Sequence, residues 1–299
     1  MSRSRKAAAA GAVVLGVTLL FALTAAGGST SGYGRVIQVH PGQLRDALQR
    51  AANGDTLVVH PGRYRGTFTI DKRLRVVGAP GERRPVIDGG CRANLTLAVR
   101  HDGVILRHLE VVGADEGFGS FPSEVDFRGV ASGRAAELVV RDTCDAEYGI
   151  NVFASREVEV VGNRGLGFSD SAVYIGGIAS TGDGALRVVA NDAYRNNRGI
   201  IVEDSAGGRI RLIGNSVHDN SSPGEGTPAG IFVRNSDAVV FSGNKALDNG
   251  SFGIHLDANS DRNRLFDNTA RRNPGGNFRD EGSGNCGSGN HPNAFSPCG

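Results

Sequence analysis

The sequence predicts an all-β protein, a single-stranded right-handed parallel β-helix (solenoid) with a short N-terminal capping helix. Two repeated phrases predict this fold. In the first, a small residue is followed by alternating apolar and variable residues, at 149–153, 172–176, 199–203, 230–234 and 253–257. The second phrase ends in asparagine, at Asn163, Asn191, Asn215, Asn244 and Asn268. Repeats of this length are typical of solenoids, in which each unit buries its apolar face against the next.

The spacing of the first phrase indicates how the coils would stack. Its first apolar residues, Ile150, Val173, Ile200, Ile231 and Ile254, are 23, 27, 31 and 23 residues apart. Alternation with a period of two is the pattern of a strand, and strands this short cannot bury an apolar face alone. Like strands would therefore stack in parallel about 4.8 Å apart, and their apolar residues would form continuous columns inside the coil.

The repeated asparagines predict a column of stacked amides at one turn of every coil. Each amide would donate to one neighbour and accept from the other, which satisfies polar groups that are otherwise buried and unpaired. A similar polar column is expected after the first phrase, from Ser155, Ser205, Ser236 and Asn259.

These phrases resemble those of the secreted right-handed β-helix families. Those families include pectate lyases, polygalacturonases, alginate C5-epimerases and the periplasmic copper-maturation β-helix proteins. The opening DALQRAANGDTLVVHPGRY, residues 46–64, is also similar to the start of many such proteins. The resemblance extends from about residue 36 to the C-terminus, and its motifs are specific for the fold and not for an activity.

The first 26 residues predict a secretory signal peptide. Arg3, Arg5 and Lys6 precede an apolar run that extends from Ala7 to about Gly27 and ends in small residues. An uncleaved membrane anchor is the alternative, because the run is just long enough to span a bilayer. Cleavage would give a protein that is secreted, extracellular or in the cell envelope, without membrane attachment.

The remaining chain divides into a lead-in, 27–42, and the β-helix, 43–299. Helical spacing of Leu44, Ala47, Leu48 and Ala51 predicts a capping helix over 43–52, which would cover a bare strand edge. The first strands are predicted at 56–59, 68–70, 74–77, 85–88, 95–99, 104–106 and 109–112. Regular coils follow over 137–268, and the tail, 270–299, turns to Gly, Asn and Ser.

Two segments break the period. Residues 114–129 contain three phenylalanines and four acidic residues and predict an inserted loop. This loop would either wall a binding face or be a solvated excursion whose phenylalanines pack back on the coil. Residues 218–229, rich in Pro, Gly and Ser, form a second loop that accounts for the 31-residue step.

The four cysteines predict disulfide bonds, because an even set in an exported chain is usually oxidised. The favoured pairs are Cys286–Cys298, which would close the tail, and Cys91–Cys144. Both members of the second pair follow a strand and a turn, so they could meet across neighbouring coils. A metal site is the alternative, and the absence of CxxC spacing argues against it.

The outward residues of the first phrase form two rows, and ligands of this fold usually bind along such a face. One row is Asn151, Tyr174, Ile201, Phe232 and His255, and the other is Phe153, Gly176, Glu203, Arg234 and Asp257. Aromatic rings stack on sugar rings, and charged groups bind hydroxyls or uronate carboxylates. In the functional interpretation, Asn151, Phe153, Tyr174 and Phe232 bind substrate. His255, Asp257 and Glu203 then act as acid or base, and Arg234 clamps a carboxylate. The alternative is a solvated ladder of ion pairs.

The catalytic motifs of the resembling families are mostly missing. Alginate epimerases carry Asp-Pro-His-Asp after Tyr-Gly-Ile, whereas here residues 148–150, Tyr-Gly-Ile, are followed by Asn-Val-Phe-Ala. The paired-Asp motif and the Gly-His-Gly loop of polygalacturonases are absent as well. A calcium site of the pectate-lyase kind needs clustered carboxylates, for which only the pairs Glu124/Asp126 and Glu203/Asp204 offer candidates.

The sequence therefore predicts a monomeric secreted protein that binds an extracellular polysaccharide and could process it, as a polysaccharide lyase or another carbohydrate-active enzyme. No cofactor is definite, and Ca²⁺ is the candidate. The net charge of +2 argues against a nucleic-acid partner. The alternative function is a non-catalytic structural or accessory module of the cell envelope. With 7 His and 1 Met, the composition argues against a copper-handling role for that module.

Overall fold

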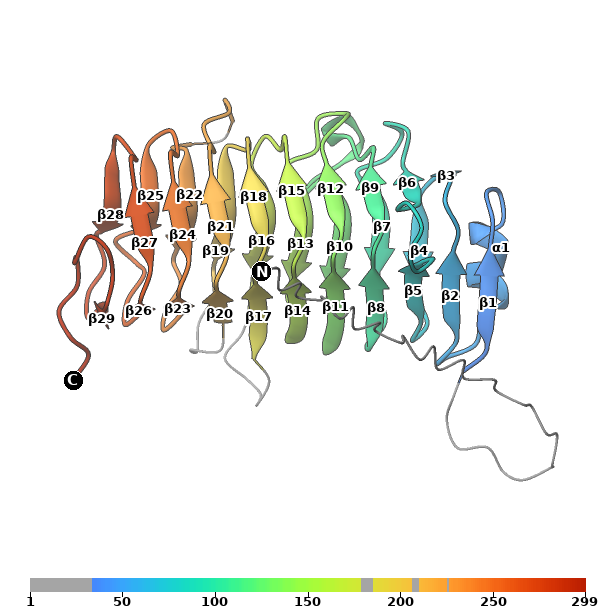
Figure 1. Ribbon diagram of the computed structural model, residues 1–299, viewed down its shortest axis with the longest axis horizontal. Helices are drawn as coiled ribbons and strands as arrows, with labels where there is room; N and C mark the ends of the chain where they lie inside the picture. The colour runs from blue at the N-terminus through green and yellow to red at the C-terminus, as the bar shows by residue number, and fades with distance from the viewer. Residues whose placement is uncertain (1–33, 179–184, 206–209, 225) are drawn as a thin grey trace, which may run out of the picture. The chain divides into compact units, whose positions relative to one another are not determined.

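The computed structural model describes residues 34–178, 185–205, 210–224 and 226–299. The predicted signal peptide and the first part of the lead-in lie outside these ranges. In the described part, the chain passes through three parallel sheets in turn, so each strand pairs with the equivalent strand of the next coil (Figure 1). This is a parallel β-solenoid of about nine turns, and the predicted fold class is confirmed.

Twenty-nine strands are present in the described residues, and they belong to three sheets. Sheet A contains β1 (Val36–Val39), β2 (Thr56–Val59), β5 (Arg75–Gly78), β8 (Val104–Arg107), β11 (Ser132–Ala136), β14 (Glu157–Val161), β17 (Leu186–Val189), β20 (Ile210–Ile213), β23 (Val240–Ser242), β26 (Arg264–Phe266) and β29 (Cys286–Ser288). Sheet B contains β3 (Arg63–Arg65), β6 (Val86–Asp88), β9 (Glu110–Val112), β12 (Val139–Arg141), β15 (Arg164–Leu166), β18 (Asp192–Tyr194), β21 (Ser216–His218), β24 (Lys245–Leu247) and β27 (Thr269–Arg271). Sheet C contains β4 (Phe68–Ile70), β7 (Leu95–Val99), β10 (Ser123–Arg128), β13 (Tyr148–Phe153), β16 (Ser171–Gly176), β19 (Arg198–Glu203), β22 (Ala229–Arg234), β25 (Phe252–Leu256) and β28 (Gly276–Asp280).

The predicted capping helix is α1 (Leu44–Arg50), which lies beside β1 at the N-terminal end of the solenoid (Figure 1). Leu44, Ala47 and Leu48 are buried and join the main core. All seven predicted early strands are present, whereas β1 and β3 were not predicted. In the described residues, no helix is long and apolar enough to cross a membrane.

The first repeated phrase forms the strands of sheet C, and its apolar residues form the predicted inner column. Val152, Ile175, Val202, Val233 and Leu256 are paired from coil to coil and have no solvent exposure. Because parallel pairing places equivalent residues of successive strands at the same depth, these side chains form one buried column along the solenoid.

The small residue that opens each phrase lies at a bend in the strand. The ladder pairs Tyr148 with Ser171 and then Ile150 with Val173, so Gly149 and Ala172 are left out of the pairing. A Cβ atom at Gly149 would lie 2.5 Å from the carbonyl oxygen of Ala172 and 2.8 Å from the side chains of two core residues. A larger side chain therefore does not fit at Gly149, and the bend turns the residue before it outward instead of inward.

The predicted asparagine column is present and fully hydrogen-bonded. From Asn163 to Asn290, each amide Nδ2 donates to the Oδ1 of the asparagine one coil further on, at 2.9 Å. The same Nδ2 also donates to a backbone carbonyl on the preceding coil, as Asn191 does to Val160. Each step thus satisfies groups that are out of reach of water.

The sequence interpretation missed a second column and misplaced a residue in a third. Asparagines 196, 220, 249 and 273 repeat the same amide pattern at the turn between sheets B and C. In the hydroxyl column, the backbone N–H of Ser236 donates to the hydroxyl of Ser260. Asn259, which was predicted to be in this column, is exposed. The turn after β25 is one residue longer than the equivalent turns of the preceding coils. The hydroxyl group that continues the column therefore belongs to Ser260, one residue after Asn259.

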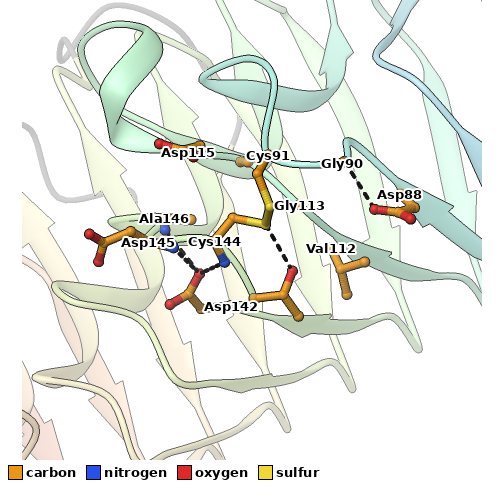
Figure 2. The surroundings of a disulfide bond; sticks show 12 residues. Asp88, Gly90, Cys91, Val112, Gly113, Asp115, Asp142, Cys144, Asp145 and Ala146 are labelled. Carbon is orange, nitrogen blue, oxygen red and sulfur yellow. Dashed lines mark hydrogen bonds between the residues drawn. A yellow bond between two sulfur atoms is a disulfide. The ribbon is translucent and has the colours of Figure 1, made fainter.

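Both favoured disulfide bonds are present. Cys91–Cys144 joins the turn after β6 to the turn after β12, with a Cα–Cα distance of 5.4 Å (Figure 2). The sequence analysis expected this bond to join neighbouring coils. Because β9 lies between β6 and β12 in sheet B, the bond instead spans an intervening coil. Asp142 supports the Cys144 turn by accepting the backbone N–H groups of residues 144, 145 and 146 at 2.9–3.0 Å.

Replacing Asn215 by leucine should destabilise the solenoid strongly. The Asn215 amide donates to the Val188 carbonyl and to Asn244, and its Oδ1 accepts the backbone and side-chain N–H of Asn191. Asn215→Leu keeps the volume but leaves several buried groups unpaired, each costing about 1–3 kcal/mol. We expect a loss of at least about 3 kcal/mol in the free energy of urea unfolding.

The matched control is Asn259→Ala, which removes an exposed asparagine side chain and should change stability by less than about 0.5 kcal/mol. Equal unfolding midpoints for the two variants would contradict a stabilising role for the amide column.

Candidate functional site

The bend in the sheet C strands from β7 to β28 places three outward rows of side chains on the surface of the sheet. The rows are Tyr148, Ser171, Arg198, Ala229 and Phe252; Asn151, Tyr174, Ile201, Phe232 and His255; and Phe153, Gly176, Glu203 and Arg234. The last two rows have the predicted register, although Asp257 lies beyond the end of β25. Sequence reasoning missed the first row because strict alternation would turn its residues inward.

Residues from all three rows surround a pocket of about 350 Å³ on the outer face of sheet C. Its lining is Phe121, Tyr148, Asp170, Arg198, Ile201, Glu203, Gly226, Phe232 and Arg234. Of the predicted site residues, Phe232, Glu203 and Arg234 are in this lining. Tyr174 reaches it through a hydrogen bond to Glu203.

Glu203 connects two of the predicted site residues. The hydroxyl of Tyr174 donates to Glu203 Oε2 at 2.7 Å, and Arg234 forms an ion pair with Glu203 Oε1. A Cβ atom at position 176 would lie only 2.4 Å from the Tyr174 ring. The ring can therefore lie across its strand only because residue 176 is glycine. Burial, reinforced by the Glu203 carboxylate, raises the pKa of Tyr174 far above its ordinary value, so the hydroxyl stays protonated.

A second ion pair lies on the other side of the pocket. Arg198 Nη1 donates to Asp170 Oδ1 at 2.6 Å, and the two side chains are only 11% and 7% exposed. The Arg198 guanidinium lies over the Phe232 ring, 5.1 Å from its centroid. Both guanidinium groups that line the pocket therefore have carboxylate partners, and the pocket presents paired charges between aromatic walls.

The predicted acid–base residues His255 and Asp257 are not in the pocket lining. The His255 ring packs between Phe232 and Phe252, with centroid distances of 5.0 and 4.6 Å. Burial lowers its pKa, and its Nε2 is 3.7 Å from Glu281 Oε2, too far for a hydrogen bond.

Asp257 closes a turn. Its Oδ1 accepts the hydroxyl of Ser260 at 2.6 Å and the backbone N–H groups of Asn235 and Asn259 at 3.1 and 3.2 Å. A carboxylate with this many structural donors is suited to holding the turn.

The carboxylate pairs considered for calcium point apart. Asp126 lies on the outer face and pairs with Arg100 and Arg128, whereas Glu124 turns inward at the bend of β10. Asp204 lies in the turn after β19, where it accepts from Asn235 at 2.7 Å. Among the described residues, no three His, Cys, Asp or Glu side chains converge on a point that could hold a metal ion.

The predicted loop over 114–129 is shorter than expected, because residues 123–128 form the regular strand β10. Val125 and Phe127 are fully buried in the core. The strand was missed because Glu124 occupies the bend position that is Gly or Ala in the later coils. The remaining loop contains a 3₁₀ helix at Glu116–Phe118 and then Phe121, which lines the pocket and contacts the strand face.

Glu124 fastens the base of this loop. Its carboxylate is fully buried and accepts the backbone N–H groups of Gly113 and Ala114 at 2.8 and 3.2 Å. Burial outweighs these hydrogen bonds and raises the pKa of Glu124 to about 8. The Cys91–Cys144 bond (Figure 2) lies beside the same base. There the backbone N–H of Cys91 donates to the carbonyl of Gly113.

Comparison with known proteins identifies a family. The family model of the periplasmic copper-binding protein NosD matches residues 127–291. The chain belongs to the NosD family. No match was found among curated protein sequences.

Solved structures share the fold of this NosD-family chain at low sequence identity. Pectate lyase Pel9A has a TM-score of 0.61 at 15% identity, over 80% of this chain and 69% of its own. The GH136 lacto-N-biosidase from Eubacterium ramulus has a TM-score of 0.58 at 12% identity, over 86% and 62%. ORF18 of Geobacillus virus E2 has a TM-score of 0.57 at 15% identity, over 84% and 61%. The chain thus spans less than two thirds of the latter two, and these likenesses show the fold alone.

The family description names copper, and the described residues do not fit a copper centre. No three potential ligands among His, Cys, Asp and Glu converge in the described ranges, and all four cysteines are in disulfide bonds. We therefore derive no copper chemistry for the pocket.

The buried Glu124 should make the stability of the protein depend on pH. Its pKa is raised from 4.5 to about 8, so the folded state holds a proton that the unfolded state releases between these values. The stabilisation is complete below about pH 4.5 and is lost as the pH rises through about 8. Glu124→Gln stays neutral, so we expect it to become more stable than the parent as pH rises, by up to about 5 kcal/mol.

Urea unfolding of the parent and Glu124→Gln, measured from pH 4 to pH 9, tests this expectation. Glu159→Gln, which changes a partly exposed carboxylate on sheet A, is the control. Parallel pH profiles for the parent and Glu124→Gln would show that Glu124 is not protonated in the folded state.

Proposed function

We propose that the pocket on the outer face of sheet C binds a sugar chain made largely of neutral residues. The observation that supports this most is the combination of aromatic walls with paired ions. Phe121, Tyr148 and Phe232 give the pocket an aromatic lining against which sugar C–H groups can pack. The Glu203–Arg234 and Asp170–Arg198 pairs offer donors and acceptors fixed in position for hydroxyl groups.

The charge balance selects the class of sugar. A carboxylate clamp of the kind expected for Arg234 needs a cation without a partner, and both arginines of the pocket already pair with carboxylates. A uronate would have to displace Glu203 or Asp170 from its arginine. A neutral sugar can bind while both pairs stay intact.

Two structures of similar fold carry names that refer to sugar-chain chemistry, a pectate lyase and a lacto-N-biosidase. They support a carbohydrate ligand for this chain at the level of fold only. The periplasmic description of the family and two disulfide bonds favour a location outside the cytoplasm.

We propose binding without turnover. Both oxygens of Glu203 are engaged, one by Tyr174 and one by Arg234, which suits a fixed hydrogen-bonding surface better than proton transfer. His255 and Asp257, the other predicted acid–base residues, lie outside the pocket lining. An accessory module that recognises a glycan fits this arrangement.

A panel of neutral and acidic polysaccharides tests the proposal, with and without Ca²⁺. Binding is measured by calorimetry, and products are followed by reducing-end release and by the absorbance of unsaturated uronates. We expect a neutral glycan to bind without product, at an affinity that depends little on salt, since unpaired charges are not used. Reproducible product, or affinity restricted to uronates, would contradict the proposal.

Glu203→Gln should weaken this binding about tenfold, because it loses the ion pair that orients Arg234. Glu159→Gln is the matched control, since Glu159 pairs with Arg134 on the unrelated face of sheet A. If Glu203→Gln and Glu159→Gln bound the glycan with equal affinity, the ligand would not bind in this pocket.

A further inference from the structure

Asn151 is an exception among the buried asparagines of this protein. It lies in the outward second row, between Asp126 on β10 and Tyr174 on β16, and has no solvent exposure. Neither its Oδ1 nor its Nδ2 has a hydrogen-bond partner in the described structure. Burying an amide without partners is unfavourable, and the ladder asparagines avoid this cost completely.

The ring of Phe121 lies near the two aromatic side chains that flank Asn151 on the outer face. Tyr148 and Phe153 are the outward neighbours of Asn151 along β13, and the Phe121 ring lies 6.4 and 6.3 Å from their rings. Together with the complete burial of Asn151, these distances point to Phe121 as the cover of this side chain. The guanidinium of Arg128 closes the same side, 5.6 Å from the Phe121 ring and 4.9 Å from the Phe153 ring.

Phe121 lies at the edge of a loop whose base is fixed and whose apolar side chains face solvent. Glu124 and the Cys91–Cys144 bond hold the base. Phe118 and Phe121 are 57% and 40% exposed, and they are two of the three exposed large apolar residues in the described ranges. Phe121 also has a φ of +57°, and no other Phe or Tyr in these ranges adopts a positive φ. Rotation of one partly exposed ring would uncover Asn151 without moving the base.

The free atoms of Asn151 indicate which group would enter. The Asn151 side chain offers an NH₂ group that donates and a carbonyl oxygen that accepts, and an acetamido group carries a carbonyl oxygen that could accept from this NH₂ group. The surrounding rings would receive a methyl group. Asp126 adds no unpaired charge, because Arg100 and Arg128 pair with it. An acetamido group has this combination of a neutral amide and a methyl.

We propose that Asn151, uncovered by rotation of Phe121, binds the acetamido group of an N-acetylated amino sugar. This subsite lies beside the pocket, and the inference rests on the proposed function, because the pocket would hold the neighbouring sugar.

The test compares two probes with the same β-1,4 backbone, tetraacetylchitotetraose and cellotetraose, by calorimetry. The parent should prefer the acetylated probe by about tenfold or more. Asn151→Leu should remove this preference and should unfold at the same or a higher temperature, because the amide of the free protein makes no hydrogen bond. A marked loss of stability in Asn151→Leu would show that the amide has structural partners and would overturn the inference.

The cover is tested by the matched pair Phe121→Ala and Phe118→Ala, two exposed phenylalanines of one loop. Phe121→Ala should increase the association rate of the acetylated probe several-fold, even though it also removes one ring from the pocket lining, whereas Phe118→Ala should leave that rate unchanged. Equal rates in the two variants would exclude Phe121 as the cover.

The outcomes separate the subsite from the pocket. Equal affinity of the parent for the two probes, with sensitivity to Glu203→Gln, overturns the acetamido subsite and leaves the proposed function intact. Preference for the acetylated probe that persists in Asn151→Leu overturns the role of Asn151. Binding of no glycan in the panel overturns the subsite and the proposed function together.

Discussion

The pairing of buried amides from coil to coil is the constraint on which the rest of this structure depends. Each turn of a parallel solenoid buries backbone groups that water cannot reach. In the Asn163–Asn290 column, one side chain per coil satisfies them by donating forward and backward. An asparagine must therefore occupy the same position of the turn in every coil of the column. Coil length varies in the loops: the segment between β21 and β22 lengthens one coil, yet Asn215 and Asn244 still pair at 2.9 Å.

The same register explains why the pocket lies on sheet C. Sheet C has a bend at the start of the strands from β7 to β28, where Gly149 and its equivalents leave the ladder. The bend adds a third outward row to the two that alternation provides, and that row contributes Tyr148 and Arg198. Three rows give a surface deep enough for a pocket. The bend that leaves no room for a larger side chain at Gly149 thus also contributes residues to the pocket.

The sequence predicted most of the repeating features together with the capping helix and both disulfide bonds, and it missed the features that depend on the bend in sheet C. The inner columns, the first asparagine column and two outward rows follow from residues that recur at fixed steps. Glu124 hid β10, since a carboxylate at a bend breaks the pattern that identifies the strand. Arg198 and Asp170 were missed because alternation says nothing about a strand that bends. The second asparagine column had a signal, the steps of 24, 29 and 24 from Asn196 to Asn273, which match those of the first column from Asn191 to Asn268.

The outward rows also show how a repeated backbone can carry a single site. Inward positions stay apolar in every coil because they share one core, whereas outward positions are free to differ. Gly176 illustrates the use of that freedom, since the space left by its missing side chain lets the Tyr174 ring cross the strand and its hydroxyl reach Glu203 on the next coil. Any larger residue at position 176 would push the ring away and break the Tyr174–Glu203–Arg234 chain without affecting the core. The fold therefore depends on the residues that repeat, and the site depends on the residues that do not.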